Sequence, residues 1–425
     1  MVVRKRIFHG WVIVGIVFLT MFIGYAIRES FPLFYIPMLA EFGRSRAETA
    51  LISSISFLVY GFASAVSGAL LDKFGPKKTF TAGVLTVGIG LVGCSQATEL
   101  WHIFIFWGVI FSLGMSAVGF VPCNAVVSRW FVRKRATALG VAQAGGRESF
   151  VFSPVTQALI LAIGWRHTYL VFAAMAVITI TILAQFLRRS PEEMGLLPDG
   201  GDKTDSREET HRGQRYRSIV NKEWAAKDWS LPMAIKKYRF WALFATTLGG
   251  AVAFGIVMAH QVAFMVDIGY SAMFASFLLL IFGFVGVAGR LCGFISDIIG
   301  RERSYTLACS GVIFGFLMLT LTKDTSTAWM LYTFIISFAL FSGLSGPTMI
   351  TAEADIFEGG HLGAIIGFLN IGFGMGNAIG SWLGGYIFDA FGSYVPAFIT
   401  AMIMLALSSI CMWVAAPRKI RAVQR

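Results

Sequence analysis

Five charged residues lie inside long apolar stretches of the sequence. They are Arg28 with Glu29, Arg147 with Glu148, and Arg290. A charged side chain near the centre of a bilayer costs about 2.5–3.5 kcal/mol even on a lenient insertion scale, so such residues mark binding or ion-transfer sites. Arginine offers binding of an anion, and glutamate offers uptake and release of a proton.

Arg290 lies in a glycine-rich stretch and has no acidic residue close to it in sequence. Its guanidinium presents a planar pair of donors that matches a carboxylate. The glycines at 283, 286, 289 and 293 leave room beside this side chain. We predict that Arg290 binds a substrate carboxylate. The alternative is a structural ion pair with Glu29 or Glu148.

The other two arginines each share a helix face with polar residues. Arg28 is spaced to lie on one face with Tyr25 and Tyr35, which predicts the wall of a cavity. Arg147 and Gln143 form a second polar face, which either lines the site or makes a structural pair between helices. Adjacent helical residues point about 100° apart, so neither arginine automatically pairs with the glutamate that follows it.

Glu29 and Glu148 are the candidate proton carriers. A buried carboxyl tends to take up a proton unless a cation holds it ionised. Either glutamate could therefore be protonated when its arginine turns to the substrate; the alternative is a permanent ion pair. Three embedded positive and two negative charges leave +1. A monoanion plus one proton restores +1, so we predict an electroneutral cycle.

Further polar residues are weaker candidates. Asn370 and Asn377 share a helix face and could orient a small ligand or pack helices, and His260 could line an outer cavity or hydrogen-bond between helices. No nucleotide-binding loop, catalytic nucleophile motif or metal-ligand spacing occurs in a credible context, including around the five cysteines. We therefore predict no cofactor, no metal and no enzymatic activity.

The composition places these residues in a membrane protein. Of 425 residues, 56% are hydrophobic and 14% charged, against about 25% charged in a soluble protein. Apolar blocks near 20 residues long are typical of membrane-spanning helices. We predict an all-α fold with twelve such helices, at 10–40, 46–72, 77–97, 100–130, 134–163, 166–188, 238–266, 271–298, 302–322, 327–354, 361–388 and 393–416.

The predicted helices fall into two sets of six. Residues 1–188 form an N-terminal half and residues 238–425 a C-terminal half, and the charged interval 189–237 predicts a solvated linker. The net charge of +12 lies mainly between helices, so it does not indicate a nucleic-acid partner. With both termini inside, 28 of the 35 lysines and arginines lie inside and 4 outside. This bias predicts cytoplasmic termini.

A turn motif occurs twice, 225 residues apart, and Pro122 and Pro347 repeat at the same offset. Together with the six-plus-six layout, this indicates duplicated halves around a midplane site, as in alternating-access transporters. Glycine allows close helix approach, and the Asp and basic residues could hold one closed state and release it in another. The alternative is a helix cap with topology-setting charges. The candidate gating residues are Gly68, Asp72, Gly75 and Lys77 in the first turn, and Gly293, Asp297, Gly300 and Arg301 in the second.

The first of these turns resembles the loop signature of the major facilitator superfamily, and the resemblance extends over nearly the whole chain. Two further segments look like signatures of monocarboxylate transporters and their bacterial relatives, including the oxalate/formate antiporter group. They are Phe42-Gly43-Arg44-Ser45-Arg46-Ala47-Glu48-Thr49, and the segment from Trp130 to Gly145. The resemblance implies a substrate-binding arginine at the position of Arg290.

The sequence also departs from that family. Mammalian monocarboxylate transporters carry an Asp one turn before the helix 8 arginine, where this chain has Gly286, and a helix 1 lysine, where it has Arg28 and Glu29. The oxalate group uses a helix 11 lysine, where this chain offers only Asn370 and Asn377. These departures argue against the mammalian coupling route and against dianion exchange.

We therefore predict a proton-coupled transporter of a small organic anion, a monocarboxylate such as lactate or pyruvate. We expect it to be monomeric, in contact with lipid, in a bacterial inner membrane. The alternatives are an exchanger of the oxalate/formate type and a cation or drug/proton antiporter using Glu29 and Glu148. The embedded charge of +1 argues against a cationic substrate. A ligand sensor would carry a signalling domain, and a channel a symmetric filter; neither is expected here.

Overall fold

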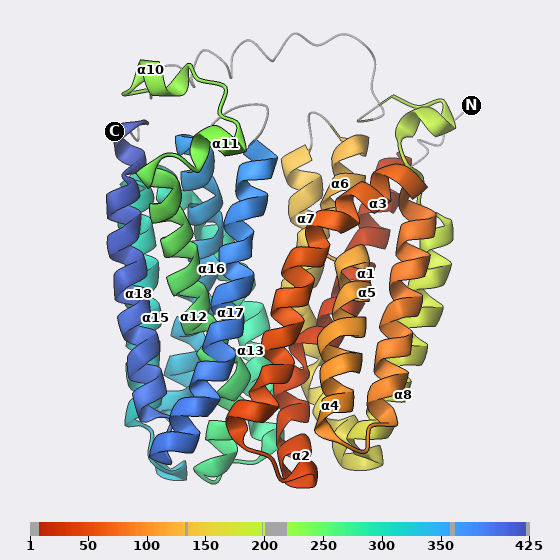
Figure 1. Ribbon diagram of the computed structural model, residues 1–425, viewed down its shortest axis with the longest axis vertical. Helices are drawn as coiled ribbons and strands as arrows, with labels where there is room; N and C mark the ends of the chain where they lie inside the picture. Colours follow the sequence, from red (N-terminus) through yellow and green to blue (C-terminus); the bar gives the residue numbers. More distant parts are fainter. Residues whose placement is uncertain (1–7, 132–134, 198, 200–218, 358–361, 422–425) are drawn as a thin grey trace, which may run out of the picture. The chain divides into compact units, whose positions relative to one another are not determined.

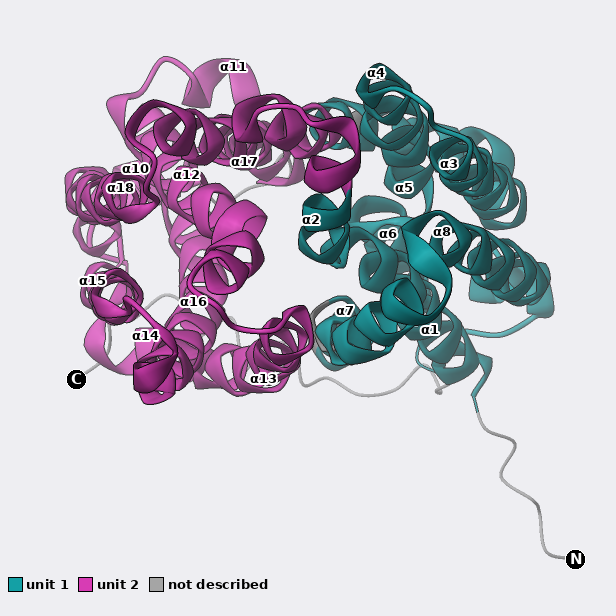
Figure 2. Ribbon diagram, turned by 90° about the horizontal axis from the view of Figure 1, so that it is seen from below, with its two compact units in different colours: residues 1–37, 58–204 teal, residues 38–57, 205–425 magenta. Residues whose placement is uncertain are grey.

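The computed structural model describes residues 8–131, 135–197, 199, 219–357 and 362–421. The chain forms two compact units, residues 1–37 with 58–204 (unit 1) and residues 38–57 with 205–425 (unit 2), shown in Figure 2. Helices make up nearly all of the described residues. The β structure within them is a single isolated bridge between Ile219 and Arg421. The predicted all-α fold class is confirmed.

Unit 1 is a helical bundle whose helices follow one another along the chain (Figure 1). The third helix, α3, turns at Gly75, and its first part, to residue 57, belongs to unit 2. The elements are α1 (His9–Glu29), α2 (Phe31–Phe42), α3 (Arg46–Ser95), α4 (Leu100–Ile103), the π-helix η1 (Phe104–Phe111), α5 (Ser112–Val118), α6 (Phe120–Trp130), α7 (Arg135–Glu148), the 3₁₀ helix η2 (Ser149–Phe152), α8 (Ser153–Gln185) and η3 (Pro191–Met194).

Unit 2 contains six long helices and several short ones. Two of the short helices, α10 and α11, precede the first long helix. The elements are α10 (Lys222–Ala225), α11 (Leu231–Ala234), α12 (Tyr238–Asp267), α13 (Ala272–Leu291), η5 (Cys292–Phe294), α14 (Ile295–Ile299), α15 (Arg301–Leu321), η6 (Thr325–Thr327), α16 (Ala328–Ile356), α17 (Leu362–Phe391), α18 (Val395–Ala415) and η7 (Pro417–Lys419).

Eleven helical segments in the described part of the chain are long and apolar enough to cross a membrane. One of them, Thr137–Gln185, has 49 residues. At 1.5 Å per residue it would be about 73 Å long, more than twice the roughly 30 Å of a bilayer core. It turns at Gly164, where φ is 79°. It therefore holds both the fifth and the sixth predicted helices, which agrees with twelve crossings of an integral membrane protein.

Several predicted helices are interrupted rather than continuous. The first breaks at Ser30, between α1 and α2. The fourth passes through the π-helix η1 and breaks at Gly119, where ψ is −156°. A Cβ at Gly119 would lie 2.7 Å from the Tyr60 hydroxyl, so this close approach requires glycine. Pro122 follows, and its ring cannot donate the helical backbone hydrogen bond.

The interval predicted as a solvated linker is folded at its far end. Trp229 is only 1% exposed, and the Trp224 indole donates a hydrogen bond to the Ile356 carbonyl at 2.7 Å. The two tryptophan rings lie 4.4 Å apart, centroid to centroid. Residues 219–237 therefore pack on unit 2, because two large aromatic side chains gain more from burial than the charged surroundings suggest.

Candidate functional site

Arg28 lies in the last turn of α1 and is 9% exposed. Its guanidinium carbon lies 4.0 Å from the centre of the Tyr60 ring, a cation–π contact. The Tyr60 hydroxyl in turn lies 3.0 Å from the hydroxyl of Tyr25. The structure thus brings together Arg28 and Tyr25, which the sequence placed on one face, and adds Tyr60 from α3.

The helix ends at this cluster. The Ser30 hydroxyl donates to the Ile27 carbonyl at 2.7 Å, and α2 begins at Phe31. From the other side, the backbone N–H of Phe120 donates to the Tyr60 hydroxyl at 3.3 Å. Irregular backbone at membrane depth is tolerated where protein or a polar cavity satisfies it, and broken helices form the substrate sites of many transporters.

A second break of the same kind occurs in unit 1. The sequence Arg-Glu-Ser-Phe at 28–31 recurs at 147–150, where α7 gives way to η2. The Ser149 hydroxyl donates to the Gly146 carbonyl at 2.7 Å, as Ser30 does to Ile27. A Cβ at Gly146 would lie 3.7 Å from the Tyr25 ring, so this break adjoins the Arg28 cluster. The side chains of Arg147 and Glu148 lie outside the described residues.

Two other predicted site residues of unit 1 are held within the bundle. Gln143 donates to the Asn124 side chain at 3.0 Å and so links α7 to α6. Tyr35 is fully buried in α2, its ring 6.4 Å from that of Phe31. The expectation that Tyr35 shares a face with Arg28 assumed a continuous helix, and the break at Ser30 changes the phase.

Arg290 is exposed in the last turn of α13. The neighbouring glycines do not leave room for a ligand, as we expected, because α16 packs against them. A Cβ at Gly289 would lie 2.1 Å from the Leu340 carbonyl oxygen, and one at Gly343 would lie 2.6 Å from that of Gly286. Binding of the substrate by Arg290 stays a prediction.

The remaining candidates of unit 2 are not gathered at one place. Asn370 is exposed, whereas Asn377 is fully buried where α17 meets α12. The Asn377 amide donates to the Phe373 carbonyl at 2.9 Å, and its Oδ1 has no hydrogen-bond partner among the described residues. His260 is fully buried and bonds to Ser381 and Tyr394, the interhelical role considered as its alternative.

The two repeated turns have the same backbone conformation. Gly75 has φ 77° and ψ 167°, and Gly300 has φ 96° and ψ 155°. Side chains other than glycine rarely adopt this region. A Cβ at Gly68 would lie 3.8 Å from Val121, which precedes Pro122, and one at Gly293 would lie 3.0 Å from Pro347. The offset of 225 residues therefore holds in the packing as well as in the sequence.

Each turn carries ion pairs. In unit 1, Arg129 pairs with the Asp72 carboxylate, and Arg189 donates to the Asp72 carbonyl at 2.5 Å. In unit 2, Arg301 pairs with Asp297 at 2.5 Å and with Asp355 at 2.8 Å. Lys77 is half-buried.

The sequence analysis missed the roles of several partners. Arg129, Arg189 and Asp355 appeared only as charges at helix ends. Arg129 and Asp355 close the fourth and tenth helices at nearly the same offset, a signal that could have paired them with the turns. Glu353, 4% exposed in α16, was missed entirely, and it makes no ion pair with another described residue.

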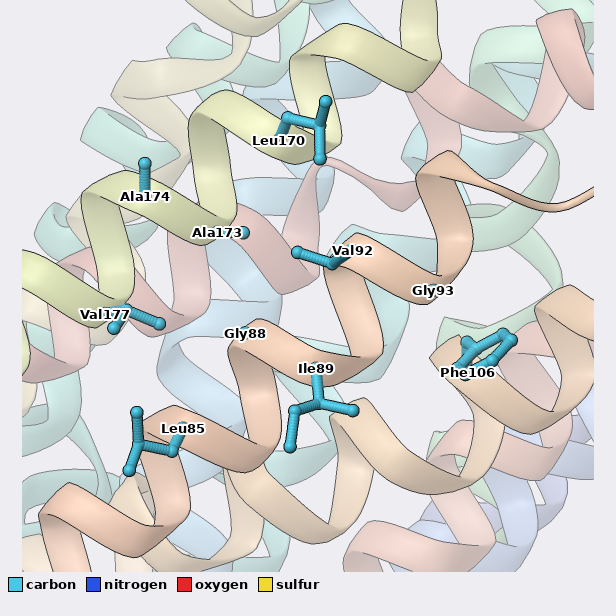
Figure 3. A pocket seen from close by; sticks show the side chains of 10 residues that line it. All are labelled: Leu85, Gly88, Ile89, Val92, Gly93, Phe106, Leu170, Ala173, Ala174 and Val177. Carbon is cyan, nitrogen blue, oxygen red and sulfur yellow. The ribbon is translucent and has the colours of Figure 1, made fainter.

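A cavity of about 660 Å³ opens on unit 1 between α3, η1 and α8 (Figure 3). The residues that line it are Leu85, Gly88, Ile89, Val92, Gly93, Phe106, Leu170, Ala173, Ala174 and Val177. None of these side chains carries a charge or a hydrogen-bonding group. The cavity therefore suits apolar groups and is unsuited to a carboxylate.

Comparison with known protein families decides the relationship. The model of the Major Facilitator Superfamily matches residues 16–355 and 326–425. The chain belongs to the major facilitator superfamily. Members of this superfamily are transporters rather than enzymes, which confirms the predictions of family, fold and absence of enzymatic activity.

Within the superfamily, the chain is similar to monocarboxylate transporters. It is 26% identical to monocarboxylate transporter 13 of Bos taurus, over 94% of this chain and 88% of that protein. It is 24% identical to monocarboxylate transporter 12 of Rattus norvegicus, over 94% and 84%. The predicted resemblance to this branch is thereby confirmed.

Solved structures support the fold. A bacterial homologue of the human lysosomal transporter Spinster, in an inward-facing and occupied conformation, has a TM-score of 0.74. The match covers 97% of both chains at 15% identity. The same homologue in its unoccupied conformation has a TM-score of 0.72. At this identity the likeness concerns the major facilitator fold alone.

Proposed function

We propose that this transporter carries a small organic anion, a monocarboxylate, together with one proton. The observation that carries the proposal is Arg28, a buried cation held on the Tyr60 ring beside a helix break. A cation in this position favours an anionic ligand, and two tyrosine hydroxyls lie within reach to bond a carboxylate. The printed names of the relatives give the same substrate class.

The proposed cycle uses the paired charges of unit 1. The Tyr25 hydroxyl interacts electrostatically with both Arg28 and Glu29, so the two opposite charges act on one place. When the carboxylate takes the arginine, Glu29 or Glu148 takes up a proton. Arg290, Arg147, Gln143, Asn377, Asn370 and His260 remain further candidates for lining the path. We further propose cytoplasmic termini in a bacterial inner membrane.

Uptake into proteoliposomes tests the proposal. Labelled lactate, pyruvate, formate, oxalate and a cationic dye are compared with and without an inward proton gradient. We expect accumulation of a monocarboxylate that follows the proton gradient and does not respond to an imposed membrane potential. Arg28→Lys keeps the charge but loses the planar group on Tyr60, and should lower uptake at least tenfold, about 1.4 kcal/mol.

Arg44→Lys is the matched control, because Arg44 is exposed in the turn between α2 and α3. It should transport as the unmodified protein does. Proton-independent exchange of oxalate for formate would replace the proposal by the exchanger alternative. Export of the cationic dye without uptake of any acid would replace it by the antiporter alternative.

A further inference from the structure

The first turn of α3 is anchored to three helices of unit 2. The Asp389 carboxylate accepts the backbone N–H of Arg46 at 3.0 Å and that of Ala47 at 2.8 Å. These are helix N-terminal amides that have no partner within their own helix. The backbones approach so closely that a Cβ at Gly385 would lie 2.7 Å from the Ala47 nitrogen.

The Arg46 side chain extends this anchor. Its two terminal nitrogens contact the two Asp267 oxygens at 2.7 and 2.8 Å, a bidentate pair at the end of α12. One of them also donates to the Tyr394 hydroxyl at 2.6 Å. The guanidinium lies 3.8 Å from the centre of the Phe388 ring. Arg46 therefore joins α3 to α12, α17 and the start of α18.

A hydrogen-bonded chain continues from Arg46 into the protein. The Tyr394 hydroxyl lies 3.2 Å from Nδ1 of His260, and Nε2 of His260 lies 2.7 Å from the Ser381 carbonyl oxygen. Tyr394 is 2% exposed and His260 is fully buried. The chain thus runs from the partly exposed Arg46 and Asp267 to a buried imidazole.

The direction of every bond in this chain is fixed by chemistry. Guanidinium only donates, so the Tyr394 oxygen accepts from Arg46 and its own hydrogen points to His260. A carbonyl only accepts, so Nε2 of His260 carries a hydrogen. Nδ1 must then be the acceptor, and the imidazole is neutral in this state.

A proton on Nδ1 conflicts with this arrangement. Two donors, N–H and O–H, would face each other, and the Tyr394 hydrogen would need another acceptor inside a buried site. The nearby acidic groups, Asp267 and Asp389, are already engaged by Arg46 and by the α3 amides. The imidazolium would also repel Arg46, since both are cations.

We propose that His260, Tyr394 and Arg46 form a proton-sensitive latch, which holds the first turn of α3 and releases it when His260 binds a proton. This deepens the proposed function, on which it rests, by giving a proton a second place to act in the cycle. Release of α3 would then accompany proton binding rather than substrate binding alone.

Cysteine accessibility tests the latch in the full-length protein in proteoliposomes. The five native cysteines are replaced by serine or alanine, and Thr49→Cys is introduced, since Thr49 is fully buried one turn into α3. Maleimide labelling is divided by that of Ser45→Cys, an exposed reference, to remove the pH dependence of the thiol itself. We expect this ratio to rise about fivefold between pH 7.5 and 5.5, the range in which histidine titrates.

Three variants decide the outcome. His260→Gln should abolish the pH dependence, and Tyr394→Phe should give rapid labelling at every pH; Arg46→Gln replaces it if Tyr394→Phe does not fold. His167→Gln, an exposed histidine in α8, should leave the pH dependence unchanged. A pH-dependent ratio that survives in His260→Gln overturns the proposal.

The labelling needs no substrate, so its outcome is separate from that of the transport assay. A flat ratio in the presence of proton-driven uptake rejects the latch and leaves the proposed function standing. A pH-dependent ratio without uptake of any acid supports the latch and rejects the proposed substrate class.

Discussion

Arg301 donates from Nε to Oδ2 of Asp355 at 2.8 Å, and both side chains are largely buried, at 14% and 15% exposure. The second partner of Arg301, Asp297, is 66% exposed. Charge pairs strengthen as water is excluded, and exposed pairs contribute about 0–1 kcal/mol. Asp355 in α16, rather than Asp297 in the repeated turn, is therefore the main partner of Arg301.

Double-mutant cycles should show this difference. Arg301→Gln is combined with Asp355→Asn and, separately, with Asp297→Asn. We expect a coupling of about 1–3 kcal/mol for the first pair and less than about 1 kcal/mol for the second, from thermal unfolding in detergent. Equal couplings would show that burial does not govern this cluster.

Asp72→Asn tests gating in unit 1. Asp72 receives Arg129, and its backbone carbonyl receives Arg189, so the substitution weakens a contact between helices and not a ligand contact. We expect substrate exchange to slow at least tenfold while equilibrium affinity changes less than about threefold. Stopped-flow fluorescence and calorimetry measure the two quantities. Loss of affinity at unchanged rates would make Asp72 a binding residue.

Arg290→Lys tests the predicted substrate contact. The variant keeps the charge and loses the bidentate group, so uptake should fall at least tenfold, or about 1.4 kcal/mol. Arg303→Lys, exposed on α15, is the control and should transport normally. Unchanged uptake by the Arg290 variant would exclude the contact.

The combined Glu29→Gln and Glu148→Gln variant tests coupling. Glutamine cannot take up the proton, so accumulation driven by the pH gradient should disappear while exchange of anion for anion continues. Both rates are measured in the same vesicles. If this variant still concentrates substrate along the gradient, the proton is carried elsewhere, and Glu353 and His260 are the next residues to replace.

Gly289→Ala tests helix packing. The added Cβ would lie 2.1 Å from the Leu340 carbonyl oxygen, so α13 and α16 must separate. We expect a loss of about 1–3 kcal/mol, measured as a lower melting temperature. Gly15→Ala in α1 is the control, because no described atom lies within 4 Å of its Cβ position. The control should melt at the same temperature or slightly higher, since alanine is the better helix former.

The sequence predicted the helices well because apolar length and the positions of lysine and arginine are written directly in it. Most of the helix ends in unit 2 lie within two or three residues of the prediction, as at α12 and α16. The breaks at Ser30 and Gly119 were not predicted, because serine and glycine are common within membrane helices. What interrupts the helix at these points is contact with a distant residue such as Tyr60.

The site was harder to predict than the fold. The embedded charges stood out because an apolar stretch makes them conspicuous, and Arg28 with Tyr25 was correctly grouped by helical spacing. Tyr60 and Tyr394 could not be found in this way, since a tyrosine in an apolar helix gives no sign of its partner. The glycines beside Arg290 show the converse: the same residues suit an open cavity and a tight helix contact, and a single sequence does not distinguish the two.

The docked end of the linker affects the order in which the protein is completed during synthesis. The Val220 N–H donates to the Ile420 carbonyl at 2.8 Å, so residues 200 positions apart finish one another. Domains fold largely in the order in which the ribosome releases them. The segment before α12 emerges early, yet it must wait for almost the last residues of the chain before it can take its final place. Until then Trp229 lacks this support, and a chaperone or the membrane surface must shield it.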